Sequence, residues 1–477
     1  MIKNYINGEL KEPLSEKYFD NYDPSTGEAF GIVPDSDERD VELAAEAAAN
    51  AFPLWSSTPV EKRSEILLEI ASLIERDAAE FARAESVDSG KPLALAKKVD
   101  IPRSIRNFQF FAHAVEGFFS ESHSGNNVIN YTLRQPVGIA GAVSPWNLPL
   151  YLFTWKIAPA LATGNCVIAK PSELTPLTAF MLSEICTEAG LPPGVLNIVH
   201  GYGHKVGRAL VLHPQVNAIT FTGGTATGRE IAATAAPMFK KLSLELGGKN
   251  PNIIFADCNY DRMLKETIAS SFRNQGQICL CGSRILIEKD IYHRFKTDFV
   301  NLTMSLKIGD PLDAASDQGA VISEAHLGKI LSYIKLAEEE GGRILCGGKR
   351  FYPEGRCSNG WFVEPTVIEG LPYNCRTNQE EIFGPVVTLL PFETEDEALE
   401  IANSTQYGLA SVIWTENISR ASRIAAKIKS GIVWINCWME RDLRTPFGGV
   451  KSSGLGREGG FEAMRFFTEP KNVCIKY

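Results

Sequence analysis

The segment AITFTGGTATG, residues 218–228, joins a short apolar run to a glycine-rich turn and then to a helical pattern. Similar apolar runs alternate with helical patterns on both sides of it, and they are IAGAV (139–143), NCVIA (165–169), VLNIV (195–199) and KLSLEL (241–246). Short apolar runs separated by helical segments are typical of a parallel sheet with crossover helices. We therefore predict an α/β fold built on a Rossmann-like, doubly wound domain.

Outside this core the pattern changes twice. Residues 38–52 and 59–84 repeat apolar side chains at three- and four-residue spacing, which predicts two amphipathic helices. A second α/β block begins with the apolar runs 252–256 and 283–287, which flank a helical pattern over 260–273.

The chain end, FFTEPKNVCIKY (466–477), alternates like a strand, and residues 127–133 are its expected partner. We assign residues 1–118 and 137–246 to a dinucleotide-binding domain and 247–445 to a second, catalytic α/β domain. Residues 119–136 and 464–477 are assigned to a small β arm for oligomerisation.

The composition excludes several classes of protein. With 477 residues, 44% of them hydrophobic and 22% charged, the chain is long enough for two or three globular domains. A net charge of −9 gives no general attraction to nucleic acid. Ten cysteines without CxxC pairs, and a first segment without an apolar signal core, predict free thiols in a reducing cytoplasm.

One stretch resembles a membrane span, because residues 135–155 contain no charged side chain. Pro145, Asn147 and Pro149 lie in its middle, where prolines would interrupt a spanning helix. We predict a buried strand followed by a loop, and no membrane contact.

Two strand ends carry side chains suited to a nucleotide. Gly223, Gly224 and Gly228 form a turn that opens a helix, and such a turn presents backbone N–H groups to a pyrophosphate. Glu173 follows another apolar run, where a carboxylate accepts the hydroxyls of an adenosine ribose and repels a 2′-phosphate, which favours NAD over NADP. Lys170 would instead favour NADP, because its ammonium could bind that 2′-phosphate.

The sharpest local signal is Gly276–Cys281, with the sequence GQICLC. Two thiols two residues apart cannot face one point from an extended backbone, so one is a candidate nucleophile and the other a packed neighbour. His200 and His204 lie in a glycine-rich loop without an acidic or thiol partner at ligand spacing, so no metal site is expected.

Seven motifs in this order resemble those of the NAD(P)-dependent aldehyde dehydrogenase superfamily. They are SPWN (144–147), KPSE (170–173), FTGGTATG (221–228), LELGGK (244–249), GQICLCGSR (276–284), EIFGP (381–385) and PFGGVKSSGLGRE (446–458). The resemblance runs from YINGE (5–9) to the final strand.

The resemblance implies a set of catalytic roles. Cys279 would attack the aldehyde carbon, and the Asn147 side chain and the Cys279 backbone N–H would hold the oxyanion. Glu245, which ends an apolar run, would be the base that activates water against the thioester. Glu381 would bind the nicotinamide ribose and Phe383 would flank the ring.

The remaining cofactor positions are also implied by the resemblance. The positions expected to contact NAD are Trp146, Lys170, Ser172, Glu173, Gly223, Gly224, Thr225, Gly228, Leu246, Glu381 and Phe383. The family often has a hydroxyl residue where this chain has Gly224, so the pyrophosphate contact would depend more on backbone and on Trp146. A homodimer or homotetramer is expected.

Within the superfamily the chain resembles the dehydrogenases of 2-aminomuconate and 2-hydroxymuconate semialdehydes, which belong to tryptophan and aromatic-ring degradation. The phrases that carry this resemblance are DIPR (100–103) with NFQFFA (107–112), residues 148–165, and WMERDL (438–443). These substrates carry a carboxylate far from the aldehyde. Arg103 and Arg441 match the arginines that would clamp it, and Arg444 is a rival.

Other functions stay open on sequence alone. Betaine aldehyde and medium-chain aldehydes are the alternative substrates. A cysteine hydrolase would use Cys279 without a dinucleotide, and a transfer to coenzyme A would have no need for Glu245 as a base. If the protein had only a structural role, the presence of Cys279, Glu245 and Asn147 together would be a coincidence.

Overall fold

The apolar runs around residue 218 form the centre of an eight-stranded sheet in the computed structural model, which describes residues 1–477. In sheet order its strands are β2 (Glu9–Lys11), β1 (Asn4–Ile6), β9 (Leu196–Ile198), β8 (Cys166–Lys170), β7 (Ile139–Val143), β10 (Val216–Thr222), β11 (Lys241–Glu245) and β21 (Gly454–Leu455). The five strands from β9 to β11 are parallel. Their chain order reverses between β7 and β10, and ligands bind at such a switch point in open α/β sheets.

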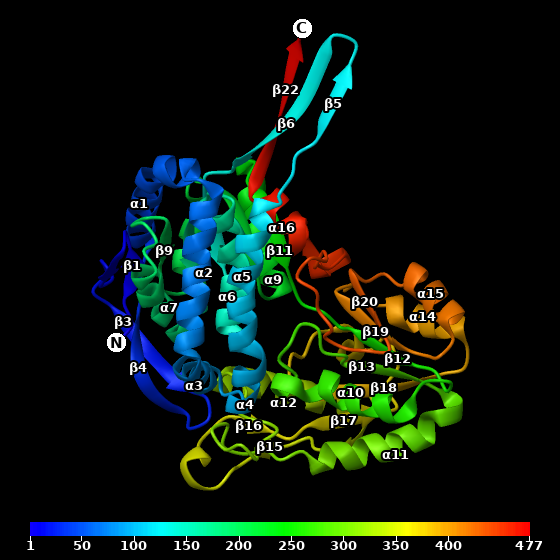
Figure 1. The fold of residues 1–477 in the computed structure, drawn as a ribbon. Helices are drawn as coiled ribbons and strands as arrows, with labels where there is room; N and C mark the ends of the chain where they lie inside the picture. The colour runs from blue at the N-terminus through cyan, green and yellow to red at the C-terminus, as the bar shows by residue number, and fades with distance from the viewer.

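Helices cover this sheet on both faces, and α2, α5 and α6 stand side by side on one of them (Figure 1). The helices are α1 (Glu38–Ser57), α2 (Val60–Arg76), α3 (Ala78–Ser89), α5 (Ile101–Glu116), α6 (Pro149–Ala162), α7 (Leu177–Glu188), α8 (Arg208–Leu212) and α9 (Thr225–Ala235). The largest apolar core joins them to the sheet. The single helix expected over 59–84 is wrong, because the chain breaks at Asp77 into α2 and α3.

The uncharged stretch 135–155 contains more helix than we expected. After β7 a short loop leads into α6, which begins at Pro149, and all of α6 is buried. The expected loop was wrong because a proline in the first helical turn loses only an N–H that has no partner there. No helix in the structure is long and apolar enough to cross a membrane.

A second sheet forms the other lobe, at the lower right of Figure 1. In sheet order its strands are β14 (Arg343–Cys346), β17 (Thr366–Glu369), β18 (Val386–Phe392), β13 (Arg284–Glu288), β12 (Pro251–Ile254), β19 (Ala410–Trp414) and β20 (Ile432–Ile435). Only β14 runs antiparallel to its neighbour. The accompanying helices are α10 (Tyr260–Phe272), α11 (Lys289–Ser305), α12 (Glu324–Glu339), α13 (Arg376–Gln379), α14 (Glu395–Asn403) and α15 (Ile418–Lys427), and β15 (Arg350–Phe351) pairs with β16 (Phe362–Val363).

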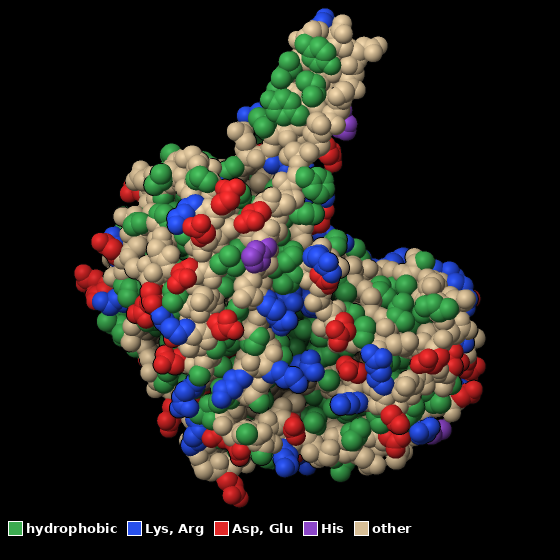
Figure 2. Space-filling model, in the orientation of Figure 1, with side chains coloured by type: hydrophobic (Ala, Val, Ile, Leu, Met, Phe, Trp, Pro, Cys, Tyr) green, Lys and Arg blue, Asp and Glu red, His purple; other side chains and the backbone are tan.

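A three-stranded antiparallel sheet projects from the first lobe as an arm (Figure 1). It consists of β5 (Ser122–Gly125), β6 (Val128–Pro136) and β22 (Thr468–Lys476), the last preceded by α16 (Gly460–Phe466). Residues 468–476 pair with 136–128 within the chain, so the expected strand partner is found. Apolar side chains, including the exposed Leu133 and Ile475, gather on the arm (Figure 2).

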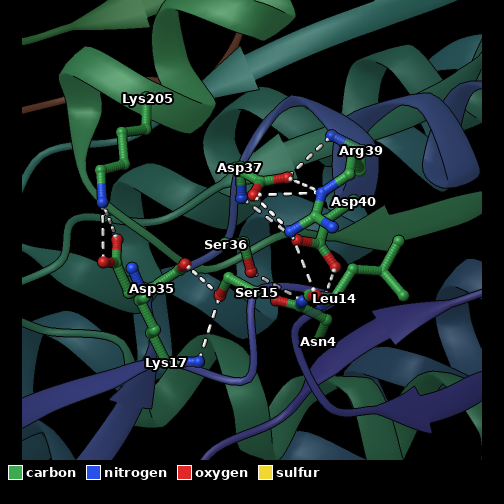
Figure 3. A network of polar contacts seen from close by, with 10 residues as sticks. All are labelled: Asn4, Leu14, Ser15, Lys17, Asp35, Ser36, Asp37, Arg39, Asp40 and Lys205. Atoms are coloured by element: carbon green, nitrogen blue, oxygen red, sulfur yellow. Dashed lines mark hydrogen bonds and ion pairs between the residues drawn. The ribbon is translucent and has the colours of Figure 1, made fainter.

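The N-terminal residues contact the edge of this lobe next to the switch point. The hairpin of β3 (Tyr18–Asp23) and β4 (Glu28–Pro34) leads to Asp35, whose carboxylate pairs with Lys205 at 2.7 Å (Figure 3). Lys205 belongs to a π-helical turn over Gly203–Gly207. Two residues further, Asp37 caps α1 in a reciprocal arrangement with Asp40 (Figure 3). The turn at 203–207 is thereby fixed beside the switch point.

Candidate active site

The carboxyl ends of three parallel strands build a cleft at the switch point. Trp146 follows β7, Glu173 follows β8 and Gly223 follows β10. They line a cavity of about 440 Å³, and the residues around it include Pro145, Trp146, Lys170, Ser172, Glu173, Gly203, Gly207, Phe221, Thr222, Gly223, Gly224 and Thr227. Its position and its glycine turn fit a dinucleotide.

The glycines of the turn differ in what they permit. A Cβ on Gly224 would meet nothing within 4 Å, which leaves the backbone open to the cleft. A Cβ on Gly223 would lie 2.4 Å from Phe221, and one on Gly228 would lie 2.4 Å from Leu246. Gly228 is therefore a packing glycine, and neither it nor Thr225 lines the cavity.

The two charges at the end of β8 form a pair. The Lys170 ammonium donates to Glu173 Oε2 at 3.0 Å and to the carbonyl of Pro171 at 2.7 Å. Burial raises the pKa of Glu173, but the charge of Lys170 and the hydrogen bonds to the carboxylate together outweigh burial and hold the pKa below its ordinary value. Ser172 accepts a hydrogen bond from the Leu174 N–H. A carboxylate that stays ionised therefore faces the cleft.

A smaller cavity of about 250 Å³ continues the cleft toward the second lobe. It shares Trp146, Gly223 and Gly224 with the larger cavity. Its lining also includes Asn147, Leu246, Gly247, Cys279, His326, Lys329, Glu381 and Phe383. The predicted thiol and the predicted cofactor residues of both lobes thus surround one continuous space.

Cys279 lies in a tight loop between α10 and β13. The residues Asn274 and Gln275 adopt left-handed backbone angles with φ of 54° and 56°, which turn the chain sharply before the cysteine. The Asn250 amide donates to the carbonyls of Cys279 and Cys281 at 2.7 and 2.9 Å. Cys279 lines the cavity, whereas Cys281 is buried in the apolar core of the second lobe.

The electrostatic surroundings of Cys279 favour the protonated thiol. Burial raises its pKa most, followed by the nearby carboxylates of Glu245 and Glu381, and Arg441 opposes the rise. A base is therefore needed to generate the thiolate. The Cys279 backbone N–H makes no hydrogen bond within the protein and is free to serve an oxyanion.

Asn147 lies against the same loop. Its side chain is 4% exposed, and its amide donates one hydrogen bond to the carbonyl of Gln277 at 2.9 Å. A carboxamide has two N–H donors, so one remains for a ligand beside Cys279.

Glu245 ends β11 and is also 4% exposed. Its Oε1 has no hydrogen-bond partner. Burial raises its pKa well above the ordinary value, the Glu458 carboxylate raises it further, and Lys156 opposes the rise. Lys156 donates to Glu458 at 2.8 Å from within buried α6. The result is a buried carboxyl group whose pKa is raised, as suits a proton acceptor beside a thiol.

Glu381 and Phe383 enter the smaller cavity from the second lobe. Glu381 accepts a hydrogen bond from the Gly248 N–H at 2.8 Å. A Cβ on Gly247 would lie 2.3 Å from the Glu381 carboxylate, so only glycine fits there. The Phe383 ring meets Trp146 edge to face at 5.3 Å. A carboxylate and two aromatic rings thus line one wall.

Arg103 and Arg441 contact the same two aromatic rings. The Arg103 guanidinium lies 5.3 Å from the ring centres of Tyr151 and Trp155, and that of Arg441 lies 5.8 and 5.5 Å from them. Arg441 also donates to the Tyr151 hydroxyl and lies 3.9 Å from the Phe447 ring.

Arg103 has no carboxylate partner, in contrast to the arginines of ordinary ion pairs. Arg103 is 7% exposed, and its Nε and Nη2 have no hydrogen-bond partner. Burial lowers its pKa to about 10. The rival Arg444 instead makes a bidentate pair with Asp442 on the surface. Buried guanidinium donors without acceptors are suited to an anionic ligand.

Several residues around the site were not predicted from the sequence. Lys156 and Glu458 form the buried pair behind Glu245, and His326 and Lys329 line the smaller cavity. Arg273, half-buried, lies 4.9 Å from the Trp438 ring without an acidic partner. Lys156 had a visible signal, because it is the one charge in the apolar helix α6. The others depend on contacts between distant segments.

A Rossmann-like cleft that reaches a thiol, with a buried carboxyl group and arginines without a carboxylate partner nearby, is the arrangement of an enzyme site rather than of a binding module. The Aldehyde dehydrogenase family model matches residues 11–473, and this chain belongs to that family. The predicted fold class is thereby confirmed, as is the prediction of an aldehyde-oxidising enzyme.

The chain is also similar to individual proteins over its full length. It is 51% identical to 2-aminomuconic semialdehyde dehydrogenase from Homo sapiens, over 100% of this chain and 98% of that one. It is 45% identical to 2-hydroxymuconic semialdehyde dehydrogenase from Pseudomonas sp. (strain CF600), over 100% and 99% of the two chains. A crystal structure of betaine aldehyde dehydrogenase from Staphylococcus aureus, in complex with NAD+, has a TM-score of 0.97 at 37% identity and covers 99% and 94%.

Proposed function

We propose that this aldehyde dehydrogenase oxidises a muconic semialdehyde to the dicarboxylate with NAD as hydride acceptor. The candidate substrates are 2-aminomuconate and 2-hydroxymuconate 6-semialdehyde. The observation that carries the proposal is the pair Arg103 and Arg441, which lie against the same two rings. Buried Arg103 has two guanidinium nitrogens without an acceptor, and such donors need an anion. Relatives at 51% and 45% identity that bear these substrates in their names support it.

The first step is addition of the thiol. The Cys279 thiol loses its proton to Glu245, the charged neighbour that most raises its pKa, and its sulfur bonds to the aldehyde carbon. The carbonyl oxygen becomes an oxyanion. The free N–H of the Asn147 amide and the Cys279 backbone N–H would donate to it.

Oxidation follows from this adduct. NAD, when bound, supplies the acceptor for the hydride that leaves the adduct carbon. The oxyanion re-forms a C=O bond as the hydride departs, so Cys279 carries a thioester. Trp146, Phe383 and Glu381 would hold the reacting end of the dinucleotide, and Lys170, Ser172 and Glu173 the adenosine end.

Hydrolysis of the thioester completes the cycle. Glu245 would first release the Cys279 proton to solvent and then take a proton from water. The hydroxide would bond to the acyl carbon, the Cys279–acyl bond would break, and the proton on Glu245 would pass to the departing sulfur. The products are the carboxylic acid and the free thiol. The buried position of Glu245, with an unpartnered Oε1, supports this role.

NAD is preferred over NADP in this proposal. Glu173 stays ionised beside Lys170, so the ammonium that could have bound a 2′-phosphate is already paired. Homologous structures solved with NAD+ are consistent with this preference. The ten free cysteines fit a reducing compartment such as the cytoplasm.

We also infer that the arm of β5, β6 and β22 joins subunits into a homodimer or homotetramer. Its exposed apolar side chains support this, because Leu133 and Ile475 are 41% and 47% exposed on a thin projecting sheet. Assignment of residues 1–118 and 137–246 to cofactor binding and 247–445 to catalysis remains part of the same proposal.

One steady-state experiment tests substrate and coenzyme together. Both muconic semialdehydes, betaine aldehyde and a medium-chain aldehyde are each oxidised with NAD and with NADP, and kcat/KM is compared. We expect a muconic semialdehyde with NAD to give the highest value. A higher kcat/KM for betaine aldehyde or for the medium-chain aldehyde would contradict the proposed substrate.

A further inference from the structure

Three buried charges lie directly behind the Asn147 loop, outside the cavity. Glu85 on α3, Lys91 just after α3 and Asp100 before α5 all have fully buried side chains. The Lys91 ammonium lies 2.9 Å from Asp100 Oδ1 and 3.8 Å from Glu85 Oε1. Burying an ion cluster is costly, so a cluster kept next to an active site requires a reason.

Besides its two carboxyl partners, Lys91 contacts the Asn147 loop. Its ammonium donates to the main-chain carbonyl of Asn147 at 3.0 Å, and the Asn274 amide donates to the same carbonyl at 3.0 Å. Two donors on one carbonyl fix the orientation of that peptide plane, and with it the direction of the Asn147 side chain.

Glu85 holds the other side of the same loop. Its carboxylate accepts from the Leu150 N–H at 3.2 Å, in the first turn of α6, and from the Thr178 hydroxyl at 2.9 Å. A carboxyl oxygen beside a helix N-terminus gives the otherwise unpaired N–H groups there an acceptor. Burial raises the pKa of Glu85 and Asp100, and the Lys91 ammonium opposes both rises.

The cysteine loop is tied to the same cluster. The Gln275 amide donates to the carbonyl of Gly90, next to Lys91, at 3.2 Å, and the Asn147 amide donates to the Gln277 carbonyl at 2.9 Å. Asn274 and Gln275 are held in left-handed conformations that cost energy in isolation. The bonds join the Lys91 turn, the Asn147 loop and the cysteine loop in a ring.

We propose that Lys91 is a positioning residue: held by Asp100 and Glu85, it fixes the Asn147 carbonyl and so aims the Asn147 amide at the oxyanion formed on Cys279. This inference rests on the proposed function, because it assumes the oxyanion role of Asn147. It adds a residue that touches neither substrate nor cofactor, since Lys91 lines no part of the two cavities.

The test is a double-mutant cycle on kcat. Asn147→Ala should lower kcat about 10²- to 10³-fold, as removal of one oxyanion donor does. Lys91→Met should lower kcat about 10- to 100-fold with KM for NAD changed less than threefold. In the Asn147→Ala background, Lys91→Met should cost less than about threefold more, because its effect passes through Asn147.

The controls separate positioning from general stability. Lys240→Met removes another buried lysine that donates to a main-chain carbonyl, that of His213, far from the site, and should leave kcat unchanged. If Lys91→Met does not fold, Asp100→Asn takes its place in the cycle with the same expected pattern, because it removes the closer anchor of Lys91.

The possible results distinguish failure of the Lys91 inference from failure of the proposed function. Independent, multiplicative losses in the double variant, or an unchanged kcat in Lys91→Met, would overturn the positioning role while leaving the proposed function intact. An unchanged kcat in Asn147→Ala would overturn the oxyanion assignment first, and the inference about Lys91 with it.

Discussion

The charged groups around Cys279 form two sets, an arginine side and a carboxyl side, and the two sets are held differently. On one side Arg103 and Arg441 pack against Tyr151 and Trp155, and two nitrogens of Arg103 have no acceptor. The carboxyl side consists of Glu245 and Glu381, whose charges act on the thiol, and of Glu458 next to Glu245; Glu245 and Glu458 are buried and Glu381 is half-buried.

This difference separates binding from proton transfer. The unpartnered donors of Arg103 carry a free-energy cost that a bound anion would relieve, so the arginine side is suited to the distant carboxylate of a substrate. The carboxyl side has a raised pKa at Glu245, so it is suited to moving protons at the aldehyde end. A substrate with an aldehyde at one end and a carboxylate at the other fits this polarity.

The strongest way to break the comparison is to remove the thiol between the two sides. Cys279→Ala should lower NADH production at least about 10⁴-fold, because no covalent adduct can form. Absorbance of NADH at saturating substrate measures it. Cys281→Ala is the matched control, since that thiol belongs to the core, and it should retain activity within a few-fold. Comparable losses in both variants would contradict the assignment of Cys279 as nucleophile.

The carboxyl side is tested next, at Glu245. Glu245→Gln keeps the shape of the side chain but cannot accept a proton, so turnover should fall about 10²- to 10⁴-fold. Because the base acts when deprotonated and its pKa is raised, wild-type kcat should increase as pH rises through that pKa. The variant should lose this pH dependence. A pH profile of kcat that is identical in wild type and variant would exclude Glu245 as the titrating base.

The site residues that could be predicted from sequence patterns are those next to an apolar run. Glu173, Gly223 and Glu245 each follow such a run, and parallel strands bring their carboxyl ends to one edge. The five parallel strands were found for the same reason. Family motifs then supplied Cys279 and Asn147, whose residue types alone favoured a packed thiol and a turn.

What the sequence did not predict arises from contacts between distant segments. Lys91 and Asp100 lie nine residues apart, and nothing in their spacing predicts that they pair or that Lys91 reaches the Asn147 carbonyl. The helix α6 was missed because Pro149 was interpreted as a breaker rather than as a first-turn residue. Arg103 and Arg441 are far apart in the sequence and come together because both pack against the rings of Tyr151 and Trp155.

The arginine side is sharpened by removing one charge at a time. Arg441→Ala should raise KM for a muconic semialdehyde tens-fold while sparing a neutral aldehyde, as expected for a lost charge-assisted bond. Arg103→Met should act in the same direction, and Arg444→Ala should change neither substrate, since Arg444 is paired with Asp442. Steady-state kinetics with both substrates measure the effect. Equal losses for charged and neutral aldehydes would remove the carboxylate-binding role.

The smallest expected effect is on coenzyme choice, at Glu173, a carboxylate that, unlike Glu245, is paired with a lysine. Glu173 pairs with Lys170 at 3.0 Å, so Glu173→Gln removes the repulsion of a 2′-phosphate and also frees the ammonium to meet it. The ratio of kcat/KM for NADP to that for NAD should rise about 10-fold, equivalent to about 1.4 kcal/mol. Lys170→Met tests the partner: it should leave NADP disfavoured, because the carboxylate remains. If Glu173→Gln left the ratio unchanged, coenzyme choice would rest on the backbone of the glycine turn rather than on charge.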